Sequence, residues 1–301
     1  MFEKILFPVD FSLHSDTIMK CVPELKKAGM EKAVFVHAID PTEASQWANV
    51  EEAIATRGKE AEGKMADFIS KKMSPLGIAG TYRTGVGLPH HVILKIAEEE
   101  QASLIVMGSH GHSYMKGAVL GSVTHKVATL TRVPLLIAKI QSFEGEGEQR
   151  VACMKLKDLF RKILYPTDFS SYAQTVLQVI TDLKMTEIDA VVVVHIQDTR
   201  KLLPYLQHMM GKFNEIDSER LSEIERKLHV AGYKVITILK EGVPFVEVNR
   251  IAEEEDVSLI MLASQGKGYI REALMGSVSE AIAREHVRPV MIIPSKWEIY
   301  N

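Results

Sequence analysis

A glycine-rich segment followed by a helix start is the part of this sequence best suited to hold a phosphate group. The segment reads Gly108-Ser-His-Gly111, and Gly121-Ser122 then opens a helical pattern. Glycines let a ligand approach the backbone closely, and the free N–H groups and positive dipole end of a helix N-terminus attract anions. The indicated chemistry is therefore the binding of a phosphorylated ligand.

An acidic residue is expected to face this phosphate cradle. Pro8, Val9 and Asp10 follow the first apolar strand of the sequence. A carboxylate does not favour phosphate, but it accepts hydrogen bonds from ribose hydroxyls in dinucleotide-binding folds. Taken singly, a Gly-x-x-Gly segment also suits a tight turn, and Asp or Gly-Ser suits a helix N-cap. Their joint occurrence at one end of one sheet favours a nucleotide site.

The chain contains an internal duplication. Residues 4–12 recur as residues 162–170 with seven of nine positions identical, and residues 96–111 recur as 251–266 with ten of sixteen identical. The offset is 158 residues for the first pair and 155 for the second. A nearly constant offset of this size indicates two copies of one domain rather than a solenoid. We predict domains at residues 1–141 and 158–301, joined by a polar, acidic linker at 142–157.

Each copy alternates short apolar strands with segments of helical spacing, which predicts an α/β fold with a parallel sheet. The predicted architecture is two tandem open parallel five-stranded sheets, Rossmann-like, with strand order 3-2-1-4-5 and helices on both faces. Expected elements in the first copy are 5–9, 15–28, 33–39, 50–73, 81–85, 88–101, 104–107, 121–130 and 135–139. Those in the second are 163–167, 173–183, 190–196, 212–231, 234–239, 244–255, 259–262, 276–285 and 290–293.

Composition bounds the possible functions. The 301 residues are 46% hydrophobic and 25% charged, with a net charge of −3, which excludes a disordered or fibrous chain. The missing basic excess argues against nonspecific nucleic-acid binding. We expect no signal peptide and no membrane span. Two isolated cysteines suit a reducing compartment, so a cytoplasmic location is expected.

The spacing Gly108-x2-Gly111-x9-Gly121-Ser122 resembles the ATP-binding signature of the universal stress protein family. Pro8-Val9-Asp10 and Val36-His37 are similar to the same family, and the resemblance covers nearly the whole chain as two tandem domains. It implies that adenine lies near Val9 and bonds the backbone of Val36. The further residues that the resemblance assigns are Asp10 and Gly108 at the ribose, Gly111, Gly121, Ser122 and Val123 at the phosphates, and Met107 and His110 lining the cleft.

The second copy departs from this pattern at one position, because Ala263 replaces the first glycine of the signature. An alanine there resists a positive φ if the backbone needs one; otherwise its methyl group narrows the ribose site. We therefore expect the second site to bind more weakly or to prefer AMP. Its candidate residues are Pro166, Thr167, Asp168, Val194, Gly266, Gly276, Ser277 and Val278.

The resemblance implies a regulatory or stress-response protein that binds ATP or AMP, with Mg²⁺ as a possible companion of ATP. Members carrying the signature pair through their last strands, so segments 135–139 and Val290–Ile293 are expected to form an internal pseudo-dimer. A homodimer and an unidentified regulatory protein are further possible partners.

Three alternatives stay open. The first is an enzyme, either a slow ATPase or a phosphoryl or adenylyl transferase, for which His110 is the one candidate base. The second is a nucleotide-free interaction scaffold, and the third is a flavin- or NAD-binding fold. The sequence favours a binding protein over an enzyme. It offers no P-loop signature, and its histidines have no partners at metal-motif spacing, so no catalytic or metal-ligating residues are assigned.

Overall fold

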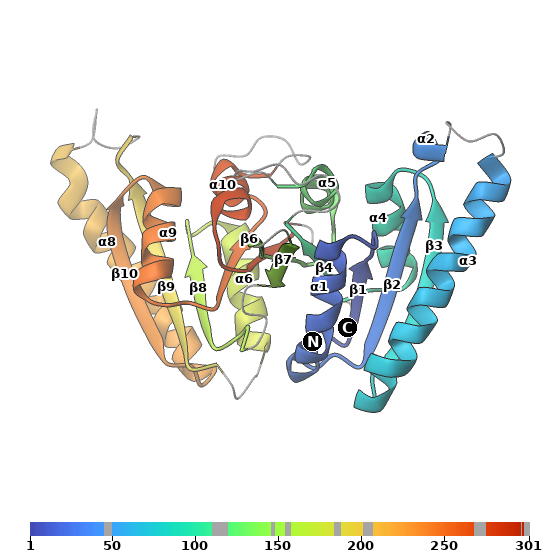
Figure 1. Cartoon of the computed structure of the whole chain (residues 1–301). Helices are drawn as coiled ribbons and strands as arrows, with labels where there is room; N and C mark the ends of the chain where they lie inside the picture. The colour runs from blue at the N-terminus through green and yellow to red at the C-terminus, as the bar shows by residue number, and fades with distance from the viewer. Residues whose placement is uncertain are drawn as a thin grey trace. The chain divides into compact units, whose positions relative to one another are not determined.

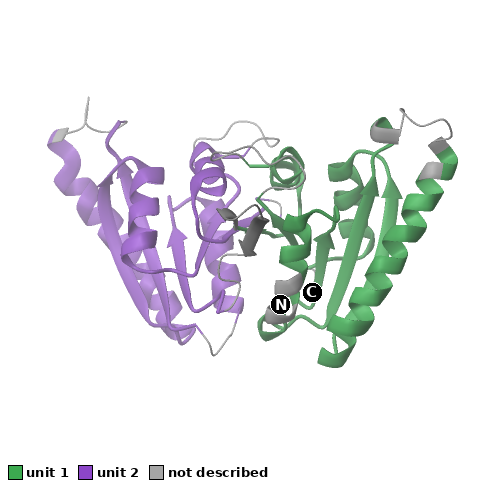
Figure 2. Cartoon of the chain, viewed as in Figure 1, with its two compact units in different colours: residues 1–157 green, residues 158–301 purple. Residues whose placement is uncertain are grey.

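The computed structural model describes residues 1–44, 50–109, 120–145, 148–153, 158–183, 188–200, 207–267, 275–295 and 297. The chain divides into two compact units, residues 1–157 and 158–301 (Figure 2). Each unit is described by itself. Within the described residues, no helix combines the length and apolarity needed to cross a membrane.

The first unit is built on a parallel five-stranded sheet in the order β5-β4-β1-β2-β3. Its strands are β1 (Lys4–Pro8), β2 (Lys32–Ile39), β3 (Ala79–Val86), β4 (Leu104–Gly108) and β5 (Leu135–Ala138). When the sheet is listed from its β3 edge, the strand order is 3-2-1-4-5. This confirms the predicted topology. The order reverses between β1 and β4, and ligands of such folds bind at the carboxyl ends of the strands there.

Helices cover the two faces of this sheet (Figure 1). The helices of the first unit are α1 (Leu13–Cys21), α2 (Pro41–Ala44), α3 (Val50–Phe68), α4 (Pro89–Glu99) and α5 (Ser122–Leu130). Right-handed crossovers place α1 and α3 on one face and α4 and α5 on the other. Consistent with this, α3 packs on β2 and β3, while α4 packs beside α5.

The second unit repeats this architecture with the order β10-β9-β8-β11-β12. Its strands are β8 (Lys162–Pro166), β9 (Ala190–Asp198), β10 (Val235–Gly242), β11 (Leu259–Ala263) and β12 (Val290–Ile293). Its helices are α6 (Ser171–Asp182), the 3-10 turn Gln207–Met209, α8 (Met210–Val230), α9 (Pro244–Glu254) and α10 (Ser277–Glu285). The predicted strand order is confirmed in this unit as well.

The inner strands form the core of each unit because helices cover both of their faces. Ile5 and Leu6 in β1 and Leu104 and Ile105 in β4 are fully buried. Such continuous apolar runs are typical of strands inside parallel sheets. The edge strand β3 instead alternates between exposed and partly buried residues. The carboxyl end of β1 beside β4 is therefore held on a rigid, buried scaffold.

Two predicted helices change their winding before they end. The helix expected over 15–28 becomes a 3-10 helix at Val22–Ala28, where Pro23 has no N–H to donate to an α-helical bond. The helix expected over 50–73 becomes a π-helix at Ile69–Met73, which ends with the backbone N–H of Ser74 donating to the Ile69 carbonyl. A 3-10 turn at Ser74–Leu76 follows.

The segment predicted as a linker contains a β-hairpin. Strands β6 (Ile140–Gly145) and β7 (Glu148–Cys153) pair antiparallel, with Ile140 opposite Cys153. Its polar composition gave no sign of a strand. The domain limits at residues 141 and 158 stay a prediction.

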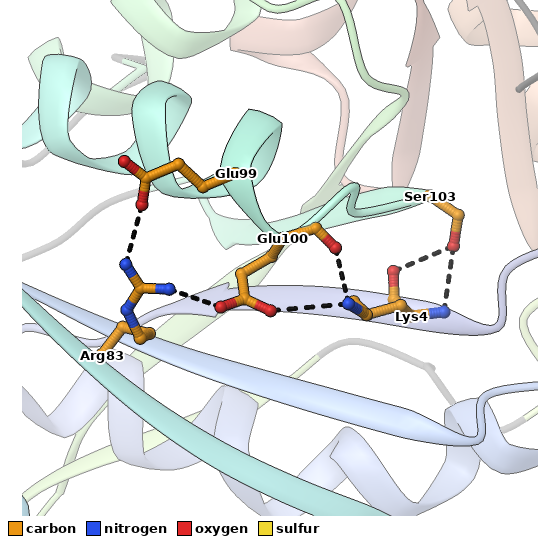
Figure 3. Close-up of polar contacts among 5 residues, drawn as sticks. All are labelled: Lys4, Arg83, Glu99, Glu100 and Ser103. Carbon is orange, nitrogen blue, oxygen red and sulfur yellow. Dashed lines mark hydrogen bonds and ion pairs between the residues drawn. The ribbon is translucent and has the colours of Figure 1, made fainter.

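A charged network braces the first unit at the amino-terminal end of its sheet (Figure 3). Lys4 Nζ donates to the backbone carbonyl of Glu100, 2.6 Å away, and contacts its carboxylate at 3.4 Å. Arg83 binds the carboxylates of both Glu99 and Glu100. These cations compensate the acidic end of α4, where carboxylates oppose the helix dipole. The second unit repeats one contact, with Lys162 Nζ 2.8 Å from Glu255 Oε2.

Candidate functional site

The turn after β1 positions Asp10 at the carboxyl edge of the first sheet. The N–H of Val9 donates to the Val36 carbonyl at 2.8 Å, which keeps the chain beside β2 for one residue past Pro8. Phe11 then takes a left-handed backbone conformation with φ of 57°. Asp10 Oδ1 accepts from the backbone N–H and the hydroxyl of Ser12, at 3.0 and 2.6 Å. The turn therefore fixes the carboxylate at the end of the strand.

The end of β4 and the start of α5 meet at the same edge. The N–H of Gly121 donates to the Ser109 carbonyl at 2.8 Å, and the Thr124 hydroxyl donates to the Gly108 carbonyl at 2.9 Å. Gly121 occupies the N-cap of α5 and supplies no side-chain cap. The first backbone N–H groups of α5, including those of Ser122, are therefore available to an acceptor from outside the helix.

The structure brings together most of the residues expected in the first site. Pro8, Val9 and Asp10 follow β1, Met107 and Gly108 end β4 on the neighbouring strand, and Gly121, Ser122 and Val123 begin α5. Val36 lies in β2, opposite Pro8. His110 and Gly111 lie outside the described residues.

The second unit repeats the arrangement, and there a hydrogen bond across the site is described. Gly276 N–H donates to the Ser264 carbonyl at 2.8 Å, and the Ser279 hydroxyl donates to the Ala263 carbonyl at the same distance. Asp168 Oδ1 accepts from Ser170 N at 3.0 Å, while Asp168 Oδ2 accepts from Lys267 N at 2.7 Å. The carboxylate is thus bonded directly to the glycine-rich segment.

The other expected residues of the second site lie at the same edge. Pro166 ends β8, and the N–H of Thr167 donates to the Val194 carbonyl at 2.8 Å. Ser277 and Val278 begin α10 after the N-cap Gly276. Val194 is buried in β9, opposite Pro166.

The two glycines of the second site have different steric roles. A Cβ built on Gly266 would lie 2.6 Å from Asp168 Oδ2, a distance that requires one of the two to move. A Cβ on Gly276 would meet its nearest atoms at 3.6 Å, an ordinary van der Waals contact. Only Gly266 is therefore required by close approach.

The backbone conformation decides between the two expected effects of Ala263, resistance to a positive φ and narrowing of the ribose site. Neither Gly108 nor Ala263 has a positive φ. The backbone therefore accepts alanine without strain, and the substitution adds a methyl group to the end of β11.

The hydrogen bonds of Asp168 govern its acidity. Burial alone would raise the pKa of this carboxyl group, but the bonds from Ser170 and Lys267 outweigh burial and lower the pKa below its ordinary value. Asp168 is therefore ionised at neutral pH, as an acceptor for hydroxyl groups must be.

The alternating direction of the backbone groups in β2 singles out Ala38, which sequence patterns do not reveal. In a parallel strand, successive residues bond to opposite neighbours. Val36 bonds toward β1, whereas the Ile39 carbonyl accepts from Gly87 on the β3 side. The backbone N–H and carbonyl of Ala38 therefore point to the β1 side of β2. The pairing of β1 with β2 ends at Pro8 and Val36, so these groups lie past the end of β1. By the same alternation Ile196 faces past the end of β8 in the second unit.

One histidine recurs beside each turn. His37 Nδ1 lies 2.7 Å from the Val9 carbonyl, and His195 Nδ1 lies 2.7 Å from the Thr167 carbonyl. The rings of Phe11 and Phe169 lie against them, with centroids 5.0 and 4.4 Å apart. The histidines hold the strand ends from which Asp10 and Asp168 follow.

Comparison with known proteins gives the family of this fold. The model of the universal stress protein family matches residues 1–139 and again residues 159–294. The chain belongs to the universal stress protein family. The two matches coincide with the two copies seen in the sequence, so it is a tandem member.

Individual universal stress proteins resemble parts or all of the chain. One from Methanocaldococcus jannaschii, MJ0577, is 29% identical over 46% of this chain and 97% of its own length. YxiE from Bacillus subtilis is 40% identical over 25% of this chain and 51% of its own length. A crystal structure from Archaeoglobus fulgidus shares the fold over 98% of this chain and 99% of that chain, with 23% identity and a TM-score of 0.73.

A solved universal stress protein in complex with cAMP covers 45% of this chain and 98% of its own. It shares 17% identity with a TM-score of 0.36. Its ligand is a property of that protein.

Proposed function

We propose that this universal stress protein binds an adenine nucleotide, ATP or AMP, at the carboxyl edge of each sheet and acts as a regulatory binding protein. One observation carries the proposal. In both units, a carboxylate, a strand end and an uncapped helix start meet at the point where strand order reverses. This combination matches the separate needs of ribose and phosphate.

The carboxylates are the proposed ribose ligands. Asp10 and Asp168 accept hydrogen bonds. In each unit the glycine-rich segment follows the strand next to the one that the carboxylate follows. In the second unit, Asp168 Oδ2 already accepts from Lys267 N. A ribose hydroxyl would share this oxygen or take the place of the amide.

The proposed adenine position lies past the end of the first strand of each sheet. The Val36 carbonyl already accepts from Val9, so the backbone groups of Ala38 are better placed to bond the edge of a base. A free N–H and carbonyl on one residue can bond an adjacent acceptor and donor, and adenine offers such a pair at N1 and its amino group. Val9, which is 4% exposed, supplies apolar contact.

The helix starts are the proposed phosphate sites. In the first unit the N–H groups of Ser122 and Val123 would bind the phosphates, beside Gly111 and Gly121, which the family resemblance also assigns to this position. Ser277 and Val278 have the matching place in the second unit, beside Gly266 and Gly276. Any Mg²⁺ would enter with ATP, bound to its phosphates.

Calorimetric titration tests this proposal. ATP and AMP are titrated, with and without Mg²⁺, into the wild type, Gly121→Val and Gly276→Val after any co-purified nucleotide is stripped. We expect the tighter binding to be lost in Gly121→Val and the weaker binding in Gly276→Val. A stripped, folded wild type without affinity for either nucleotide would contradict the proposal.

A further inference from the structure

The ring of His195 makes two contacts, and one further proton can bind at Nε2 between the ring and a carboxylate. Its Nδ1 lies 2.7 Å from the Thr167 carbonyl, which can only accept, so Nδ1 carries a hydrogen. In the neutral ring, Nε2 then has a lone pair, yet it faces Asp217 Oδ2 at 3.4 Å. Two acceptors face each other there. A second proton on the ring would convert this contact into an ion pair.

Asp217 is prepared for that role by its other partners. Gln197 Nε2 donates to Oδ2 at 2.9 Å, and Arg220 Nη1 lies 3.4 Å from Oδ1. Both partners are donors, so the contact with His195 Nε2 is the one place around Oδ2 where two acceptors meet among the contacts described. The side chains of His195 and Asp217 are each 13% exposed, so little water competes for the contact.

Burial keeps the second proton off the ring under ordinary conditions. It lowers the pKa of His195 below the ordinary value of 6.5, and this outweighs the opposite effects of the Thr167 bond and Asp217. The ring is therefore neutral near pH 7. Added negative charge nearby would move its pKa upward.

The proposed nucleotide site adjoins this histidine. The ring of Phe169, the residue after Asp168, lies against His195, and Lys267 Nζ lies 5.6 Å from the centre of the Phe169 ring. Lys267 also donates its N–H to Asp168. The charged groups acting on the imidazole or its carboxylate come from three elements: Asp217 and Arg220 on α8, Asp168 after β8, and Lys267 after β11.

We propose that the second unit takes up one proton at His195 Nε2 when it binds an anionic nucleotide. This inference rests on the proposed function of that site. The phosphates would offset the charge of Lys267, which now disfavours the imidazolium. The proton comes from solvent and is held between Nε2 and Asp217 Oδ2. The charged ring in turn strengthens its bond to the Thr167 carbonyl and so holds the Asp168 turn in place.

The first unit supplies an internal control. His37 has the same bond through Nδ1, but its neighbour Phe11 has Lys64 Nζ 5.1 Å from the ring centre. Ile39 stands where Gln197 stands in the second copy, at an offset of 158 residues. Among the described side chains, His37 makes no ion pair with a carboxylate. Proton uptake that depends on Asp217 is therefore assigned to His195.

Nuclear magnetic resonance of labelled histidine rings tests the proposal on the full chain. His195 and His37 are titrated with pH in the wild type and in Asp217→Asn, with ATP, with neutral adenosine and without ligand. We expect ATP to shift the His195 titration to higher pH in the wild type. The shift should be smaller in Asp217→Asn and with adenosine, and the His37 signals should be the same in the wild type and in Asp217→Asn.

Calorimetry in two buffers of different ionisation enthalpy counts the protons independently. We expect net proton uptake on ATP binding. This uptake should decrease in Asp217→Asn and in His195→Gln, and it should persist in His37→Gln. ATP binding with an unchanged His195 titration would overturn this inference and leave the proposed function standing. No ATP binding by the stripped wild type would overturn both.

Discussion

Asp168 Oδ2 lies 2.7 Å from the backbone nitrogen of Lys267, a residue 99 positions further along the chain. The bond joins the turn after β8 to the glycine-rich segment after β11, two neighbouring strands of the sheet. The same carboxylate also accepts from Ser170, at the N-cap of α6. One side chain thus sets the spacing of the site and the start of a helix.

Replacing Asp168 by asparagine tests this role through the pH dependence of stability. The folded-state pKa of Asp168 is below its unfolded value of 3.8, so its contribution is complete above that value and is lost as the pH falls through the folded pKa. We expect Asp168→Asn to lower the free energy of unfolding by about 1 kcal/mol at pH 7. Urea unfolding at pH 7 and below pH 3 measures the difference, which should shrink in acid. An equal loss at both pH values would contradict the prediction.

Gly266→Ala and Gly276→Ala form a matched pair. The methyl group added in Gly266→Ala would lie 2.6 Å from Asp168 Oδ2 and should break the bond from Lys267. The methyl group added in Gly276→Ala would lie 3.6 Å from its nearest atoms. We expect Gly266→Ala to cost about 1 kcal/mol through the lost bond. Gly276→Ala should cost about 0.5 kcal/mol, because alanine is a poorer N-cap residue than glycine. The pKa of Asp168, followed by carboxyl carbon resonances, should rise in Gly266→Ala alone. A rise in both variants would mean that the clash is not its cause.

An exchange of residues between the copies tests the methyl group of Ala263. Both Gly108 and Ala263 lack a positive φ, so either residue fits either backbone. We expect Ala263→Gly to strengthen ATP binding in the second unit and Gly108→Ala to weaken it in the first. A single methyl contact is worth about 1 kcal/mol, which is about fivefold in affinity. Calorimetry of each variant measures this, and opposite signs for the two variants are the required result.

Substitution of Lys4 and of Lys71 allows a partly buried ion pair to be compared with an exposed one. Lys4 also binds a helix carbonyl, and the side chains of the Lys4–Glu100 pair are 30% and 22% exposed. Those of the Lys71–Asp67 pair are 68% and 60% exposed. We expect Lys4→Met to lower the free energy of unfolding by about 1 kcal/mol and Lys71→Met by at most a few tenths. Thermal unfolding ranks the two, and equal effects would show that the brace adds nothing.

The main architecture could be predicted because buried parallel strands leave a strong signal. Ile5–Phe7 and Leu104–Val106 are continuous apolar runs, and the duplication reports the same pattern twice. The hairpin over Ile140–Gly145 and Glu148–Cys153 could not be predicted, because its polar residues have no apolar period.

The candidate site was predictable where side chains carried the information. Asp10, Gly108 and Gly121 are recognisable by type and spacing, and the structure places them at one edge. Ala38 was missed because its proposed role depends on backbone direction alone. The pairing of His195 with Asp217 was missed because Asp217 resembles any exposed carboxylate of a helix. The recurrence of His37 as His195 was the available signal.

The π-helix at Ile69–Met73 accounts for one residue of a difference in length between the two copies. The offset between equivalent residues falls from 158 at Lys4 and Lys162 to 155 at Gly77 and Gly232, so the first copy holds three more residues in between. A turn closed by an i to i−5 bond absorbs one extra residue and leaves the flanking helix in register. The widened turn also presses Ile69 against β3, where a Cβ on Gly80 would lie 2.6 Å from Ile69 Cγ2. Val235 holds the equivalent position in the second copy, opposite an uninterrupted α8. The first copy thus combines a widened turn with a glycine in the strand beneath it, whereas the second combines a regular helix with a valine.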